Sequence, residues 1–173
     1  MRALLLSWEA TSLQFVAAHV VALVAAAAVE RAWPQALRIG NVAPDLVLVL
    51  VACIGITRGR LAGYAAGLLG GFLLAASGEG SFAAVLVALM VVGLLAGLVR
   101  GRVFADHVLV APVIALLATL LASLIELIVS PPSEFVPWLA EVARLMLCNA
   151  IISPLSYLYA RAVSRRWPPR AET

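Results

Sequence analysis

The chain has 173 residues, of which 64% are hydrophobic and 12% are charged. A soluble domain needs polar side chains over its whole surface, whereas apolar runs here fill entire segments on all faces. We therefore interpret the chain as one membrane-embedded bundle, with no room left for a soluble domain. The net charge of +3 comes from arginines scattered between apolar segments, without any lysine, and this pattern excludes nucleic-acid binding.

Apolar segments follow one another along the chain, and turn-forming or charged residues separate them. We expect six membrane-spanning helices, over residues 12–29, 46–57, 61–76, 82–99, 108–129 and 142–163. Because the connections are short, neighbouring helices should be antiparallel. The alternative for the first segment is a cleaved signal peptide over Met1–Ala28. Its apolar run exceeds the usual length of about 7–15 residues, and its removal would leave five spans.

The arginines predict the orientation, because positively charged loops stay on the cytoplasmic side of a membrane. With the N-terminus inside, the outer connections hold only Arg31 and Arg38. The arginines on the inner side are Arg2, Arg58, Arg60, Arg100, Arg102, Arg161, Arg165, Arg166 and Arg170. Acidic residues show the reverse trend. We therefore expect both termini in the cytoplasm.

The second segment is too short to cross a bilayer alone, since its apolar stretch makes about 18 Å of helix against a hydrocarbon core of roughly 30 Å. Its outer part must include Asn41, Pro44 and Asp45, and irregular backbone at membrane depth requires surrounding protein or a water-filled cavity. We therefore expect an outward-facing depression beside Asp45. A simpler interpretation, compatible with the first, makes Pro44 and Asp45 the first turn of the helix, with the carboxylate favoured by the helix dipole.

Small residues recur at every fourth position in three of the expected helices. Such rows allow close approach of helices in lipid, where packing drives association. The rows are Gly63, Gly67 and Gly71 in the third helix, Gly93, Gly97 and Gly101 in and after the fourth, and Ala18, Ala22 and Ala26 in the first. Packing inside the bundle is the simpler interpretation, and docking of a partner helix is the alternative.

Few polar groups lie inside the expected spans, and an ionisable residue at membrane depth suggests a function by default. The candidates for buried polar residues are His19, Glu126, Arg144 and Asn149. We expect His19 to hydrogen-bond to a neighbouring helix rather than to relay protons. Glu141 can pair with Arg144 at a spacing of three residues on one helix.

The sequence carries none of the common catalytic motifs, such as G-x-S-x-G, H-E-x-x-H or a phosphate-binding glycine loop. Cys53 and Cys148 both fall in apolar segments, where small buried side chains are more common than a disulfide or a metal pair. We expect a protein that is not an enzyme and that has no cofactor and no metal.

Two segments resemble the rod shape-determining protein MreD family. In PDLVLVLVACIGITRGRLAGYAAGLLGG, residues 44–71, a Pro-Asp pair opens a short apolar helix, a basic turn follows, and a glycine-spaced helix comes next. In CNAIISPLSYLYARAVSRRW, residues 148–167, an asparagine and a mid-helix proline precede a basic tail. The chain departs from the family late in the third helix, where Gly70 and Gly71 stand in the neighbourhood of a frequent aspartate.

The resemblance implies a non-enzymatic scaffold of the cell-elongation complex in the bacterial inner membrane. Its implied partner is an MreC-like single-span protein, and through it MreB, RodA and a class B penicillin-binding protein. The implied fold is similar to the six-helix substrate-binding components of energy-coupling-factor transporters. That similarity supplies the rival hypothesis of a vitamin-binding transporter component, in which the alanine row of the first helix would contact the coupling subunit.

Overall fold

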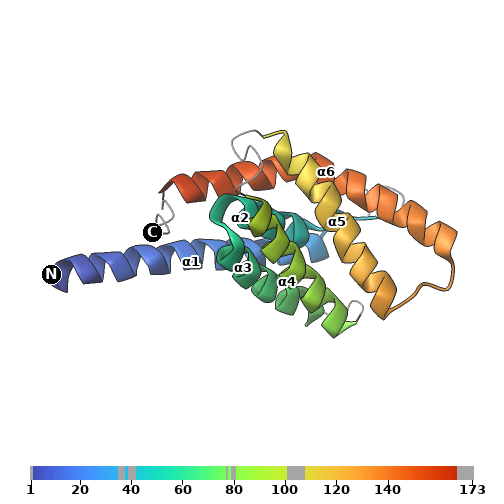
Figure 1. The fold of residues 1–173 in the computed structure, drawn as a ribbon, viewed down its shortest axis with the longest axis horizontal. Coiled ribbons are helices and arrows are strands. Elements are labelled where there is room, and N and C mark those ends of the chain that lie inside the picture. Colours follow the sequence, from blue (N-terminus) through green and yellow to red (C-terminus); the bar gives the residue numbers. More distant parts are fainter. Residues whose placement is uncertain are drawn as a thin grey trace.

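The computed structural model describes residues 2–34, 38, 42–76, 78, 81–100 and 108–166, and for residues 2–13 and 15 it describes the backbone alone. Within these residues the protein is all-helical, as predicted, and contains six helices (Figure 1). The helices are α1 (Arg2–Arg31), α2 (Leu46–Arg58), α3 (Arg60–Ala75), α4 (Phe82–Val99), α5 (Val110–Val129) and α6 (Phe135–Arg166).

Two helices extend well beyond the apolar segments that predicted them. α1 already begins at Arg2, and α6 begins at Phe135 rather than at residue 142. The start of α6 includes Pro137, which is tolerated in a first turn because the N–H that proline lacks has no partner within the helix there. Hydropathy identifies the apolar part of a helix, and the helix continues past it on either side.

α2 is the central helix of the bundle. It contacts each of the other five helices, and all of its residues from Val47 to Ile56 are buried. A helix of 13 residues that is surrounded by protein needs no contact with lipid. Its short length is therefore compatible with a position at membrane depth.

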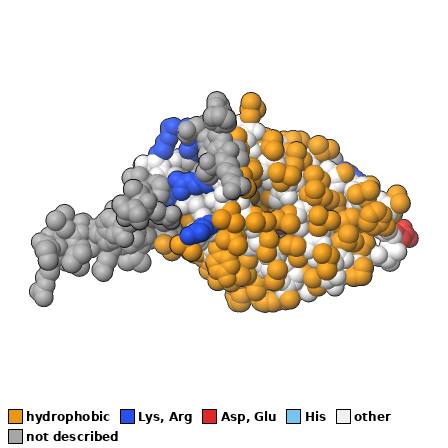
Figure 2. All heavy atoms as spheres, in the orientation of Figure 1, with side chains coloured by type: hydrophobic (Ala, Val, Ile, Leu, Met, Phe, Trp, Pro, Cys, Tyr) orange, Lys and Arg blue, Asp and Glu red, His pale blue; other side chains and the backbone are white. Residues whose placement is uncertain are grey.

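The exterior of the bundle is mainly apolar, as Figure 2 shows for one face. Large exposed side chains include Leu61, Ile151 and Leu155, each more than 70% exposed. By length and composition, α4, α5 and α6 can each cross a membrane, while α2 and α3 are shorter apolar helices. An apolar surface of this extent fits a lipid environment rather than water.

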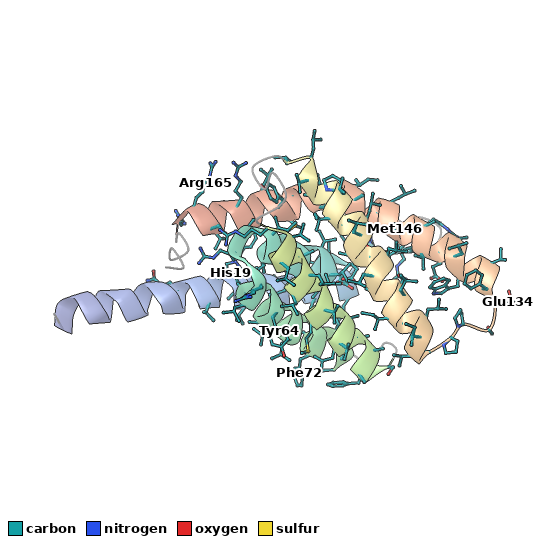
Figure 3. The ribbon with its side chains drawn as sticks, viewed as in Figure 1. His19, Tyr64, Phe72, Glu134, Met146 and Arg165 are labelled. Carbon is teal, nitrogen blue, oxygen red and sulfur yellow. The ribbon has the colours of Figure 1, made fainter. Side chains whose placement is uncertain are left out.

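Charged side chains separate toward the two ends of the bundle. α1 begins and α6 ends at the same end of the molecule (Figure 1), and the blue side chains of Figure 2 gather toward that end. Figure 3 shows Arg165 there and Glu134 at the opposite end. A Cβ atom on Gly59, between α2 and α3, would lie 3.3 Å from Nη1 of Arg100 after α4. The α2–α3 junction and the end of α4 therefore meet.

The glycines of the two rows lie between α3 and α4, which form the most extensive helix pair, except for Gly101, which lies outside the described residues. The glycines buried there are Gly63, Gly67, Gly71, Gly93 and Gly97. A Cβ atom on Gly63 would overlap the carbonyl oxygen of Gly93, and one on Gly93 would overlap that of Gly63. The two backbones touch directly, so these rows serve packing within the chain and offer no surface to a partner.

The alanine row of α1 also faces the bundle. Ala18, Ala22 and Ala26 are half-buried, and the last two pack against the core. The hydroxyl of Tyr159 in α6 donates a hydrogen bond of 2.9 Å to the carbonyl oxygen of Ala18. α1 is thereby joined to α6, and the row is not an open docking surface.

Candidate functional site

Asp45 organises the first turn of α2. It is the N-cap residue and lies outside the helix, where its carboxylate accepts a hydrogen bond of 2.7 Å from the backbone N–H of Leu48. The N–H of Val47 donates to Oε2 of Glu30, at the end of α1, over 3.4 Å. The positive end of the α2 dipole favours both carboxylates. The helix start therefore holds two acidic side chains in one place.

Asn149 fixes this helix start to two other helices. Oδ1 of Asn149 in α6 accepts a hydrogen bond of 2.8 Å from the backbone N–H of Asp45. Nδ2 of Asn149 donates to Oγ1 of Thr119 in α5 over 2.9 Å. Thr119 in turn donates to the carbonyl oxygen of Ala115 over 2.7 Å. Asn149 is 0% exposed. A buried amide with both ends bonded specifies one arrangement of α2, α5 and α6.

The proline of α6 is accommodated by its neighbour. Pro154 lacks the N–H that would bond to the carbonyl oxygen of Ala150, and the hydroxyl of Ser153 donates to that oxygen over 2.8 Å instead. The thiol of Cys53 in α2 lies 4.0 Å from the carbonyl oxygen of Ser153. Both cysteines, Cys53 and Cys148, are free and buried, as predicted. α6 therefore packs closely against the central helix at its proline.

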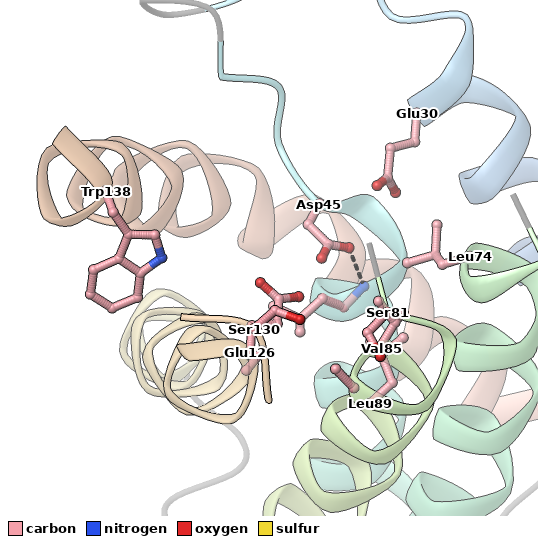
Figure 4. Close-up of a pocket in the computed structure, with 12 residues that line it drawn as sticks. Glu30, Asp45, Leu74, Ser81, Val85, Leu89, Glu126, Ser130 and Trp138 are labelled. Atoms are coloured by element: carbon pink, nitrogen blue, oxygen red, sulfur yellow. Dashed lines mark hydrogen bonds between the residues drawn. The ribbon is translucent and has the colours of Figure 1, made fainter. Parts of the chain in front are cut away.

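A cavity of about 400 Å³ opens beside Asp45 and receives residues from all six helices or their ends. The carboxylates of Glu30, Asp45 and Glu126 border it, and the indole of Trp138 lies at its edge (Figure 4). Its walls are otherwise mostly apolar. The remaining lining residues are Leu48, Leu74, Ser81, Ala84, Val85, Leu89, Ala122 and Ser130.

A second cavity, of about 430 Å³, shares Glu30, Asp45, Glu126 and Trp138 with the first. It adds an arginine and another carboxylate at its border, together with residues on either side of the α2 start. The added residues are Arg38, Val42, Ala43, Ser123, Glu141, Val142 and Leu145. We call the two together the acidic cavity.

Of the three residues expected at the depression, only Asp45 lines a cavity among the described residues. Asp45 lines both cavities, whereas Pro44 is buried and lines neither. Asn41 lies outside the described residues. Val42 and Ala43, just ahead of Pro44 in the chain, border the second cavity instead.

Two of the four predicted buried polar residues are buried, and two are not. His19 and Asn149 are 6% and 0% exposed. Glu126 is exposed, because it stands near the end of α5 at the cavity border. Arg144 is half-buried, and its Nε donates to the carbonyl oxygen of Ala140 over 3.1 Å. The prediction of burial was wrong for Glu126 and Arg144.

Sequence reasoning did not assign Glu30 and Trp138 to the depression. Glu30 stands at the end of α1, before the connection that leads to Asp45, whereas Trp138 follows the Pro131-Pro132 pair and is distant from Asp45 in the chain. The signal that could have found them is the antiparallel order, which brings the ends of α1, α3 and α5 and the starts of α2, α4 and α6 to the same end of the bundle.

The acidic cavity offers negative charge and hydrogen-bond acceptors next to apolar walls. Such a lining favours a cationic or hydrogen-bond-donating group with an apolar body attached. Among the described residues, no group of three or more His, Cys, Asp or Glu side chains is arranged to hold a metal ion.

No family model matches this chain, and neither a curated protein nor a solved structure matches it.

Proposed function

We propose that the chain is a non-enzymatic membrane scaffold of the bacterial cell-elongation complex. The observation that carries the proposal is a contact between the two segments that resemble MreD. The backbone N–H of Asp45, from the Pro-Asp opening of the first segment, donates to the amide of Asn149 in the second segment over 2.8 Å. The resemblance therefore covers one connected part of the fold rather than two separate patches.

The proposed scaffold crosses the bacterial inner membrane six times, with both termini in the cytoplasm. The separation of charge supports this topology, since side chains such as Arg165 and Glu134 lie at opposite ends of an apolar bundle (Figure 3). Arginine-rich ends stay on the cytoplasmic side. The acidic cavity then opens toward the outer face.

The proposed partner is an MreC-like single-span protein, which would connect the chain with MreB, RodA and a class B penicillin-binding protein. Because the glycines of α3 and α4 are already in contact with each other, the partner helix must dock on an outer helix surface. Exposed apolar side chains such as Leu147 and Ile151 of α6, at 61% and 73% exposure, provide surface of the required kind.

A second candidate function is a substrate-binding component of an energy-coupling-factor vitamin transporter, whose six-helix fold this bundle would share. The acidic cavity favours it, because volumes of about 400 and 430 Å³ lie in the range of small-molecule sites. The inward alanine row of α1 argues against it, since that row was the expected contact with the coupling subunit.

Purification from native membrane separates the two functions. A scaffold should co-purify with a single-span MreC-like protein, and vitamins should leave its thermal stability unchanged. Recovery of a coupling subunit without any MreC-like chain, or a rise in unfolding temperature on adding a vitamin, would refute the scaffold and favour the transporter.

A further inference from the structure

A separate feature lies along the seam between α4 and α5. An apolar groove of about 190 Å³ is lined only by residues of these two helices. Its floor is made of buried side chains, among them Val92, Ala96 and Ala118, and its rims include Leu95 and Leu117, which are 41% and 58% exposed. The groove therefore opens on the outer apolar surface of the bundle.

The groove and the first of the two hollows that form the acidic cavity lie on the same face of α4. Going along that helix, the cavity residues Ser81, Val85 and Leu89 are followed by the groove residues Val92, Ala96 and Val99. Steps of three and four residues keep side chains on one side of a helix. The groove and that hollow therefore succeed each other along one stripe.

The same order holds on α5 in the opposite chain direction. Ile114, Ala118 and Leu121 line the groove, and Ala122, Glu126 and Ser130 line the cavity. The seam is thus hydrocarbon-lined over one half of its length and ends in carboxylates at the other. Glu126 on α5 faces the same space as Asp45 and Glu30 (Figure 4).

The size of the groove limits what can lie inside it, and a transmembrane helix can rest only on its rims. Two turns of a transmembrane helix, about 10 Å wide, occupy roughly 800 Å³, several times the groove volume of about 190 Å³. An extended hydrocarbon chain is narrow enough to enter. Carboxylates at the end of the seam complement a positively charged group that donates hydrogen bonds. Arg38, which lines only the second cavity, adds a cationic side chain that can attract a phosphate.

We propose that the α4–α5 seam binds a membrane lipid with a primary-ammonium headgroup. One acyl chain lies in the groove, and the ammonium group lies in the acidic cavity beside Glu126. This site is independent of the proposed scaffold function, because it requires neither the MreC-like partner nor any of the glycine rows.

Native mass spectrometry of the full chain tests the proposal with three lipids that have the same acyl chains. Phosphatidylethanolamine, phosphatidylcholine and phosphatidylglycerol are each added to the delipidated protein. The expected order places phosphatidylethanolamine first, with an affinity roughly tenfold above the other two, the factor of one charge-assisted hydrogen bond. Equal affinities, or preference for the anionic phosphatidylglycerol, would overturn the proposal.

Glu126→Gln should remove the headgroup preference while leaving the fold intact, because Glu126 is exposed. Glu134→Gln is the matched control, since Glu134 is exposed and lines neither cavity. Ala118→Leu should fill the groove floor and release the lipid, whereas Ala83→Leu, at an exposed position of α4, should not. If Ala118→Leu does not fold, the Glu126→Gln result decides.

The occupant is checked in native membrane with a photo-cross-linker that replaces Leu117 at the groove rim. Cross-links to lipid are expected. A cross-link to a polypeptide, or a preference for phosphatidylethanolamine that survives Glu126→Gln, would show that the proposed lipid site is wrong, while association with an MreC-like protein could stand.

Discussion

Replacing Gly67 by alanine tests whether α3 and α4 meet backbone to backbone. The added methyl group would overlap the carbonyl oxygen of Leu89, and it would lie 2.7 Å from the carbonyl carbon of Leu89 and 2.9 Å from Cα of Met90. Carbon atoms in contact prefer about 3.5–4.0 Å. Since these atoms belong to the backbone of α4, they cannot rotate away, and the helices must separate.

Two opposing free energies set the magnitude. Alanine in a helix interior is more stable than glycine by about 1 kcal/mol, whereas overpacking costs about 1–3 kcal/mol. The rigid contact with α4 places Gly67→Ala toward the upper part of that range, so we expect a net loss of about 1–2 kcal/mol in the free energy of unfolding.

Unfolding of the purified protein in mixed micelles, followed by circular dichroism, measures this loss. Ala65→Gly is the matched control, because Ala65 is exposed on the same helix and reports the helix propensity alone. It should lose about 1 kcal/mol. If Gly67→Ala is as stable as the parent chain or more stable, helix propensity dominates and the close approach of the backbones is refuted.

Three further predictions concern buried and half-buried polar contacts, and unfolding measurements check each. Asn149→Leu should cost about 2–4 kcal/mol because two bonded groups lose their partner, and Thr119→Val should cost less, about 1 kcal/mol; equal losses would contradict the network. Asp45→Ala should lose about 1 kcal/mol and Asp45→Asn only a few tenths, because asparagine also caps helices; similar losses would mean that charge matters more than capping. Ser153→Ala should lose about 1 kcal/mol, and Pro154→Ala in that background should restore it by returning a backbone donor; an absence of rescue would refute the compensation.

The helices could be predicted because apolar runs end where glycine, proline or arginine interrupts them. The connection Arg58-Gly59-Arg60 separates α2 from α3 where it was expected, and φ of Gly59 is +95°, a conformation that favours glycine. The short second segment predicted protein or a cavity around the irregular backbone ahead of it, and the acidic cavity borders Asp45 there.

The faces of the helices could not be predicted in the same way. α4 is apolar on all sides, so its sequence does not indicate whether Gly93 turns toward α3 or toward a partner. Burial of Glu126 was wrongly inferred from its position inside an apolar run, since exposure depends on how α5 is rotated beside the cavity. Helix rotation comes from packing between distant segments, which hydropathy does not contain.

The topology is the claim on which the rest of the account depends, and reporter fusions test it most directly. A reporter that is active only in the cytoplasm should be active when fused after Arg170, and a reporter that is active only after export should be active when inserted between Glu79 and Gly80, in the α3–α4 connection. This is the result that arginines at one end of an antiparallel bundle predict. Export of the fusion after Arg170 would contradict it, and the proposed scaffold function would fall with the topology.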